Sequence, residues 1–169
     1  RVTSLRTSGP RGWADQLSPS GSPFVRSQNL SSDSIGLRLD SVAFVDPPDS
    51  FEAQRSRTQP GDVLVGITGA NTGWVGLVDN QISGAYVSQH VAILRPTSDV
   101  DARWLAYSYF SHEGQSQLLG GQYGGTKQQL SLAELAAFEL RVPDLSTQRE
   151  AADHIDRSVA ALAALASTL

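Results

Sequence analysis

Two stretches of this sequence approach the residue types and spacing of catalytic motifs, but each lacks a residue that the chemistry requires. Asp46-Pro47-Pro48-Asp49 is close to the D-P-P-aromatic motif of adenine methyltransferases, yet an acid stands where an aromatic ring would stack on the base. Gly120 to Lys127 has the spacing of a phosphate-binding loop up to Gly125, but it ends Gly-Thr-Lys where the loop needs Gly-Lys-Ser or Gly-Lys-Thr. We therefore predict a proline turn, a glycine loop and a chain that is not itself an enzyme.

Metal-dependent chemistry is not indicated either. His90, His112 and His154 lie on three different predicted elements, without a second ligand at the spacing of a zinc site. The sequence contains no cysteine, which excludes disulfides and thiolate ligands. We expect the chain to bind no metal and no cofactor.

Three polar clusters offer a different kind of chemistry. Side chains that donate and accept hydrogen bonds in pairs suit base edges, cations suit phosphates, and glycines let a backbone approach a duplex. The clusters are Arg26, Ser27, Gln28 and Asn29 after a predicted strand; Thr68, Asn71 and Thr72 in a glycine-bounded turn; and Gln122, Tyr123, Thr126, Lys127 and Gln128 on the glycine loop. We expect Lys127 to contact phosphate. A solvated hairpin turn is the alternative for each cluster taken alone.

The elements that would position these clusters indicate an α+β fold with a mixed or antiparallel sheet. Apolar, β-branched runs bounded by glycine or proline predict core strands, and short apolar runs between polar turns predict minor ones. The core strands are expected at 62–67, 74–78 and 86–94, and the minor strands at 24–25, 35–39 and 42–45. Residues 1–21 are rich in Ser, Gly and Pro and have no period, so we expect an irregular arm.

Helices are predicted mainly in the second half of the chain. Residues 101–119 have a helical pattern with a broad aromatic face. Ser131 and Glu134 have the spacing of a capping box for a short helix, and a strand is expected to follow and end at Pro143. A second capping box is predicted at 147–150, where the last helix would begin.

The last helix carries its apolar residues at alternating spacings of three and four. This seam consists of Ala152, Ile155, Val159, Leu162, Ala166 and Leu169. Such a heptad pattern favours a contact with another helix. A terminal helix folded onto its own domain is the alternative. We predict a globular domain over 1–145 and the start of a spacer or dimerisation helix over 146–169.

The charge balance differs from that of a typical nucleic-acid-binding protein. The 169 residues carry a net charge of −4, whereas DNA-binding domains are usually basic. Residues 1–60 contain seven Arg and six acids, and residues 61–169 contain six basic residues and eleven acids. The acid excess therefore lies in the part that we assign to scaffold and terminal helix. The chain starts at Arg1 and lacks methionine, so we expect it to be a piece of something longer.

The order of several motifs resembles a known family. G-G-Q-Y-G-G-T-K-Q-Q-L-S-L-A-E-L (120–135), then F-E-L-R-V-P-D-L-S-T-Q-R-E (138–150) and a long Ala/Leu helix, resemble the end of a target-recognition domain from the DNA-specificity subunit of type I restriction-modification enzymes. Upstream, P-F-V-R-S-Q-N-L (23–30), G-D-V-L-V-G-I-T-G-A-N-T-G (61–73) and Y-V-S-Q-H-V-A-I-L-R-P (86–96) are similar to the same family in the expected order.

This resemblance implies a cytoplasmic, non-catalytic protein that recognises one half of a bipartite site in double-stranded DNA. Its partners would be a methylation subunit and a restriction subunit, on which S-adenosylmethionine, ATP and Mg are expected. A second recognition domain, or a second copy of the chain, would pair with the terminal helix. The resemblance also implies structural roles for Gly61-Asp62 and Gln148.

Two other functions stay open at this point. The chain could be the recognition module of a single-chain restriction-methylation enzyme, which a methyltransferase core in the parent gene would indicate. Alternatively, it could be a module that binds only protein, which the acidic pI of about 5.2 favours. No apolar run approaches the roughly 18 residues of a membrane span, so no membrane partner is expected.

Overall fold

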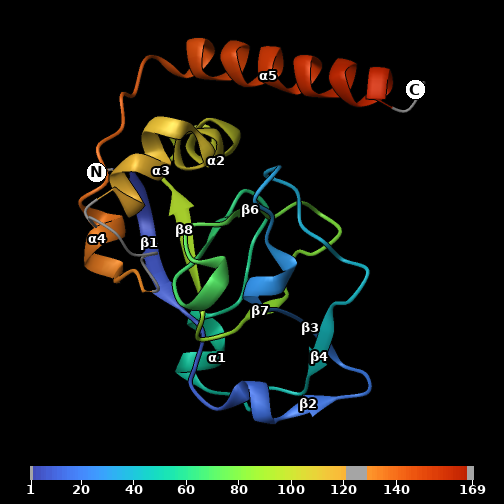
Figure 1. Ribbon diagram of the computed structural model, residues 1–169. Coiled ribbons are helices and arrows are strands. Elements are labelled where there is room, and N and C mark those ends of the chain that lie inside the picture. The colour runs from blue at the N-terminus through green and yellow to red at the C-terminus, as the bar shows by residue number, and fades with distance from the viewer. Residues whose placement is uncertain (1, 121–128, 167–169) are drawn as a thin grey trace.

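The computed structural model describes residues 2–120 and 129–166, which form two sheets and five α-helices (Figure 1). The strands are β1 (Thr3–Ser8), β2 (Leu17–Ser18), β3 (Ser22–Val25), β4 (Ala43–Val45), β5 (Val63–Gly66), β6 (Val75–Leu77), β7 (Tyr86–Val87) and β8 (Val91–Pro96). The helices are α1 (Phe51–Arg55), α2 (Ala102–Phe110), α3 (His112–Leu119), α4 (Leu132–Ala136) and α5 (Leu145–Ala166), with 3₁₀ turns η1 (Trp13–Asp15), η2 (Ser27–Asn29) and η3 (Gly69–Asn71). The predicted α+β class is confirmed.

The larger sheet has the strand order β1-β8-β5-β6 and is antiparallel throughout. Its central strands are buried on both faces, because side chains alternate across a strand and each face of the sheet packs against a different core. Val63 and Val65 pack with residues of α2, α3 and α4, whereas Leu64 packs on the opposite face with Val25 and Leu30. This two-sided burial explains why the strand reads as an unbroken apolar run rather than an alternating one.

The smaller sheet has the order β2-β4-β3-β7, in which β3 and β7 are parallel and the other pairs antiparallel. It covers a separate small core that includes Trp13 and Phe24, and the Trp13 ring lies 5.4 Å from the ring of Tyr86. The predicted strands at 24–25 and 42–45 both belong to this sheet. Residues 35–39 form no strand; instead the Ile35 carbonyl accepts a hydrogen bond from the N–H of Leu77.

Two further predictions about strands are wrong. Residues 1–21 are not an irregular arm, since β1 pairs along β8 at the edge of the larger sheet and β2 pairs with β4. Residues 86–94 are not one strand, because β7 joins the smaller sheet through β3 while β8 joins the larger one. A turn at 88–90, closed by a hydrogen bond from the Val91 N–H to the Ser88 carbonyl, separates the two.

The helix predicted over 101–119 is two helices. Ser111 ends α2, and its Oγ accepts the Gly114 N–H at 3.0 Å to begin α3. The capping box of α4 is confirmed, because Ser131 Oγ accepts the Glu134 N–H at 3.1 Å and Glu134 accepts the Ser131 N–H at 2.7 Å. The capping box predicted at 147–150 is wrong, since α5 begins at Leu145 and Asp144 accepts the Thr147 N–H at 2.9 Å. Hydrogen bonds from Ser146 and Thr147 lower the pKa of the Asp144 carboxyl.

Gly61 and Asp62 have the structural role that was expected. Gly61 has a φ of 86°, which favours glycine, and places Asp62 at the entry to β5 with no exposed surface. Both oxygens of Asp62 are paired with Arg95, to Nε at 2.8 Å and Nη2 at 2.9 Å, and one also accepts the Gln59 N–H. The hydrogen bond to Asp62 raises the pKa of Arg95. This ion pair links the start of β5 to β8.

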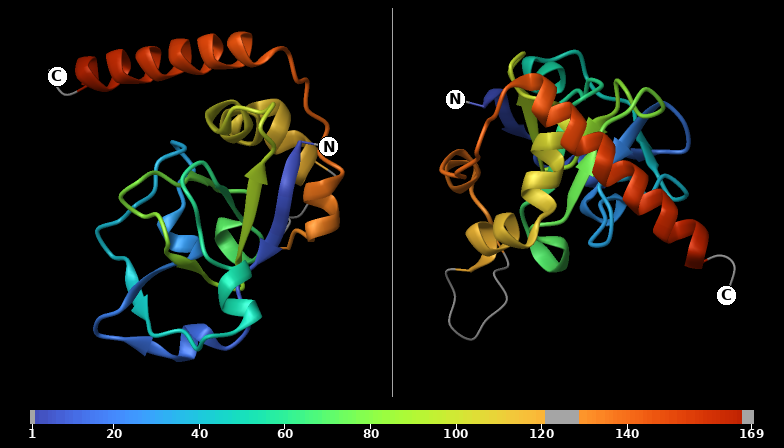
Figure 2. Two further views of the ribbon diagram at one scale, coloured as in Figure 1. Left: turned by 180° about the vertical axis from the view of Figure 1, so that it is seen from behind. Right: turned by 90° about the horizontal axis from the view of Figure 1, so that it is seen from above.

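Helix α5 lies across α2 at one end of the molecule, and α1 lies at the other end (Figure 1). The view from above shows that α5 then extends past the rest of the fold (Figure 2). Its first turns are attached to α2, where Arg103 Nη1 donates to Asp153 at 2.7 Å and to Asp156 at 2.6 Å. Burial and a hydrogen bond to Asp156 raise the pKa of Tyr107 to about 12.

Candidate nucleic-acid interface

The first predicted cluster follows β3 and is only partly available to a ligand. Gln28 is exposed, while Arg26 and Ser27 are half-buried. Asn29 is fully buried, its Oδ1 accepting the Arg26 N–H at 2.9 Å and its Nδ2 donating to the Arg38 carbonyl at 2.9 Å. These bonds close η2, so Asn29 is not accessible to a base. In the described part of the chain, the buried Nε of Arg26 has no hydrogen-bond acceptor.

The second predicted cluster lies in the turn between β5 and β6, as expected. Thr72 is 7% exposed and its Oγ1 donates to the Gly69 carbonyl at 2.7 Å, so it stabilises the turn rather than facing outward. Thr68 and Asn71 are half-buried. The hydroxyl of Thr68 is hydrogen-bonded to Nδ1 of His90.

The third predicted cluster belongs to the glycine loop. Its members Gln122, Tyr123, Thr126, Lys127 and Gln128 lie outside the described residues. The residues that follow are placed, and Gln129 forms an antiparallel bridge with Thr68 while the Leu130 N–H donates to the Ile67 carbonyl at 2.8 Å. The loop therefore rejoins the described fold beside the second cluster.

The turn at 88–90 contacts the segments that lead to the first and second clusters. Its Ser88 N–H donates to the Val25 carbonyl at 2.9 Å, directly before Arg26, and its His90 carbonyl accepts the Ile67 N–H at 2.9 Å. The Ser88 carbonyl accepts the N–H of Gly9 at 3.3 Å. A Cβ on Gly9 would lie 1.8 Å from the Val87 carbonyl oxygen, so only glycine permits this approach. The ends of β1, β3 and β5 thus meet at one turn.

An open polar pocket of about 740 Å³ lies where these segments meet. It is lined by Ser8 to Arg11, by Glu52 and Arg55 of α1, by Ile67 and Thr68, by Gln89 and His90, and by Gln129 and Leu130. Sequence reasoning found Thr68 but missed Arg11, Arg55, Gln89, His90 and Gln129. Gln89 and His90 were missed because they lie inside an apolar run that predicted a continuous strand.

The predicted helix seam divides between two environments. Ala152 is fully buried and Ile155 half-buried, so this part of the seam faces α2 of its own domain. For Ala152 the prediction of a partner contact is wrong, and the alternative of packing on its own domain is correct. Val159 is 52% exposed, Leu162 is 66% exposed and Ala166 is exposed, while Leu169 lies outside the described residues. The later part of the seam remains available to another helix.

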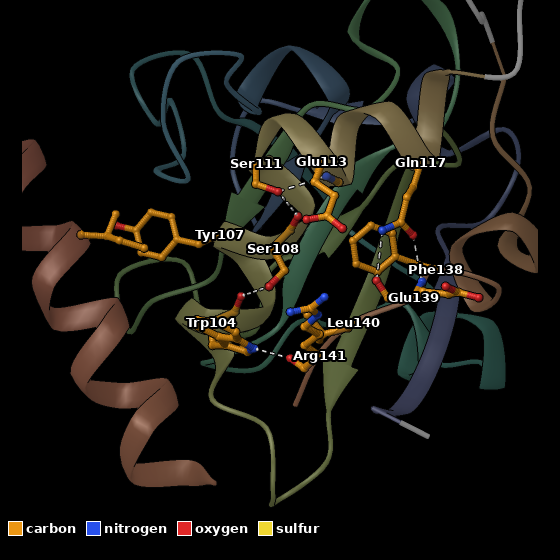
Figure 3. A pocket seen from close by; sticks show the side chains of 12 residues that line it. Trp104, Tyr107, Ser108, Ser111, Glu113, Gln117, Phe138, Glu139, Leu140 and Arg141 are labelled. Atoms are coloured by element: carbon orange, nitrogen blue, oxygen red, sulfur yellow. Dashed lines mark hydrogen bonds between the residues drawn. The ribbon is translucent and has the colours of Figure 1, made fainter. Parts of the chain in front are cut away.

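A second pocket, of about 570 Å³, lies between α2, α3 and the segment that leads to α5 (Figure 3). The Gln117 amide forms hydrogen bonds with both the N–H and the carbonyl of Glu139, at 2.9 and 3.1 Å, and Trp104 Nε1 donates to the Arg141 carbonyl at 3.1 Å. The strand predicted to end at Pro143 is therefore absent; side chains of α2 and α3 satisfy this extended main chain. Trp104 and Gln117, which line this pocket, thus position the connection to α5.

Two kinds of feature, metal-binding clusters and membrane-spanning helices, were sought in the described ranges. Residues 2–120 and 129–166 contain no group of three or more His, Cys, Asp or Glu that could hold a metal. Within the same residues, no helix is long and apolar enough to cross a membrane.

Residues 49–167 match the family model of the type I restriction modification DNA specificity domain. Since the match covers well over half of the chain, the chain belongs to this family.

Solved structures share the fold at low sequence identity. The HsdS subunit from Thermoanaerobacter tengcongensis is 19% identical with a TM-score of 0.69, over 99% of this chain and 37% of that one. A chain from a type I R-M system studied for complex assembly and conformational transition is 18% identical with a TM-score of 0.69, over 95% and 37%. The type I S subunit from M. genitalium is 19% identical with a TM-score of 0.58, over 99% and 40%. The chain thus spans less than half the length of these proteins. No curated protein sequence is significantly similar to it.

Proposed function

We propose that this chain is a target-recognition domain of a type I specificity subunit, and that it recognises one half of a bipartite DNA site. The observation that carries the proposal is the convergence of the ends of β1, β3 and β5 on the turn at 88–90. This convergence places Arg26, which follows Val25, and Thr68, which follows Ile67, beside the same turn, and Thr68 also lines the polar pocket. Polar loops on a rigid scaffold suit the reading of base edges.

The distribution of charge supports this proposal in spite of the net charge of −4. The residues that line the polar pocket include two cations, Arg11 and Arg55, and one acid, Glu52. Asp153 and Asp156 lie on α5, at the opposite end of the molecule from α1, and both are paired with Arg103. Phosphates near the pocket would therefore meet a local excess of positive charge, which is what attracts a duplex.

Helix α5 would join this domain to the remainder of a restriction-modification complex. Residues 1–145 would be the recognition domain and 146–169 the start of the spacer helix. The exposed Val159 and Leu162 would pack against a helix of a second recognition domain, a second copy, or a methylation subunit. S-adenosylmethionine, ATP and Mg would be bound by the methylation and restriction subunits of this cytoplasmic complex, and not by this chain.

The chain alone is expected to have no enzymatic activity. This follows from the missing aromatic after Asp46-Pro47-Pro48 and from the misplaced lysine after Gly125. Purified protein would be incubated with DNA and labelled S-adenosylmethionine, or with ATP. Methyl transfer or hydrolysis above the level of a buffer control would contradict the prediction.

Arg26→Ala and Gln28→Ala are expected to weaken binding to the cognate half-site by about 1–3 kcal/mol and to have little effect on random DNA, because each would remove a base contact. The measurement is a salt titration of the assembled complex on cognate and scrambled duplexes, with the cognate site found by sequencing methylated positions in cells that carry the system. Arg157→Ala on the exposed side of α5 is the charge-matched control. Equal losses on both duplexes would show that this segment does not read bases.

A further inference from the structure

Three neighbouring side chains that line the polar pocket, those of Thr68, His90 and Gln89, form a hydrogen-bonded chain. His90 Nδ1 is hydrogen-bonded to Thr68 Oγ1, and His90 Nε2 lies 3.2 Å from Nε2 of Gln89. An amide nitrogen can only donate, so His90 Nε2 must accept this bond. In this arrangement His90 Nδ1 donates to Thr68 Oγ1.

The backbone holds this histidine from two sides. Its carbonyl accepts the Ile67 N–H at 2.9 Å, and its own N–H donates to Ser88 Oγ at 3.3 Å. These bonds fix the main chain of His90, and its ring is oriented by the contacts with Thr68 and Gln89. Gln89 uses one N–H on His90, which leaves the second N–H and the carbonyl oxygen side by side. Half-buried Gln89 lines the open pocket, where these two groups can meet a ligand.

One donor beside one acceptor is the pattern that pairs with the major-groove edge of adenine. Adenine presents N7 as an acceptor and N6–H₂ as a donor, and a glutamine amide contacts both at once. We infer that Gln89 recognises an adenine of the DNA half-site through its free N–H and carbonyl, and that His90 is the residue that positions it. This inference rests on the proposed function and names the chemistry of the same surface.

Arg11 lines the same pocket and supplies a cation for the DNA phosphate next to the recognised adenine. Arg11 is exposed and forms no hydrogen bond or ion pair with any described residue, whereas Arg55 donates to Thr7. Glu52 also lines the pocket and would repel phosphate from the α1 side. The phosphate contact is therefore assigned to Arg11, and the base contact to the side formed by Gln89 and Thr68.

The experiment uses the assembled complex and duplexes in which each adenine of the cognate half-site is replaced in turn by 7-deazaadenine, which lacks N7. Wild-type protein should lose about 5- to 150-fold in affinity at one adenine, the range expected for a two-pronged base contact. Gln89→Leu, which removes both prongs, should bind the natural duplex at least as weakly as wild type binds that modified duplex, and should show no further loss on it.

The role of His90 is tested by a matched set of variants. His90→Phe removes both contacts and should reduce discrimination as Gln89→Leu does. His90→Gln places an amide near the position of Nε2 and should restore part of the discrimination that His90→Phe loses. His90→Asn reaches only the position of Nδ1 and should not restore it. Arg11→Ala should leave discrimination intact and lower the log-log salt slope by about one unit.

Three outcomes decide the question. Insensitivity of the wild-type complex to all deaza substitutions overturns the adenine contact, and this arm is independent of whether any variant folds. Unchanged discrimination by Gln89→Leu, with an unchanged melting temperature, overturns the role of Gln89. If the wild-type complex binds cognate and scrambled duplexes equally, the proposed function fails and the inference falls with it.

Discussion

A complex in which Val159 and Leu162 are both changed to Asp is expected to lose its assembly, while the globular part of the chain stays folded. The two side chains are 52% and 66% exposed, so their replacement removes little packing within the domain. In an interface with another helix, however, the two carboxylates would be buried in an apolar seam at a cost of several kcal/mol. Sedimentation of the chain and its co-purification with the methylation subunit measure the result.

The matched control is the pair Ala160→Asp and Ala161→Asp. Both residues are exposed and lie on the side of α5 away from the seam, so they introduce the same charge with a loss of helix propensity at least as large. The control should assemble like wild type. If Val159→Asp with Leu162→Asp also assembles normally, α5 does not join the domain to a partner through this seam, and the proposed spacer role fails.

The sequence predicted those parts of the fold that depend on local patterns. The apolar run of β5 and the Ser131–Glu134 capping box are both set by residues within a few positions of one another. The strand β1 was missed because it has no apolar period of its own; Thr3 and Thr7 are buried in a strand that pairs with β8, about ninety residues away. Strand pairing over such distances is not encoded in the local pattern.

The site was predicted less completely than the fold, for a related reason. Polar composition identified Asn29 and Thr72, but both side chains are used to close turns. Composition could not find Gln89 and His90, because only the contacts of the turn at 88–90 with Gly9 and Ile67 bring them to the pocket. Likewise, the heptad pattern could not distinguish Ala152, which packs on α2, from the exposed Val159 and Leu162, about two and three turns further along α5.

The second large effect is expected at Gln148, the fully buried residue that joins α5 to the domain. Its Oε1 accepts the Asp101 N–H at 2.8 Å, and its Nε2 donates to the carbonyls of Asp99 at 3.0 Å and Pro143 at 2.8 Å. Gln148→Leu keeps the volume but leaves these three main-chain groups without partners. The expected loss of stability is about 2–4 kcal/mol, since each buried unsatisfied group costs about 1–3 kcal/mol.

Denaturant unfolding of the isolated chain measures this loss, with Gln16→Leu as a control because Gln16 is exposed. Amide hydrogen exchange adds a local test. Gln148 connects the start of α5 to the residues that precede α2, so its loss should speed exchange in the first turns of α5 more than in β5. A stability change below about 1 kcal/mol would contradict the prediction, because it would mean that water or a rearranged connector satisfies the three groups. In that case the salt bridges of Arg103 to Asp153 and Asp156, the hydrogen bond of Tyr107 to Asp156 and the packing of Ala152 would hold α5 against α2.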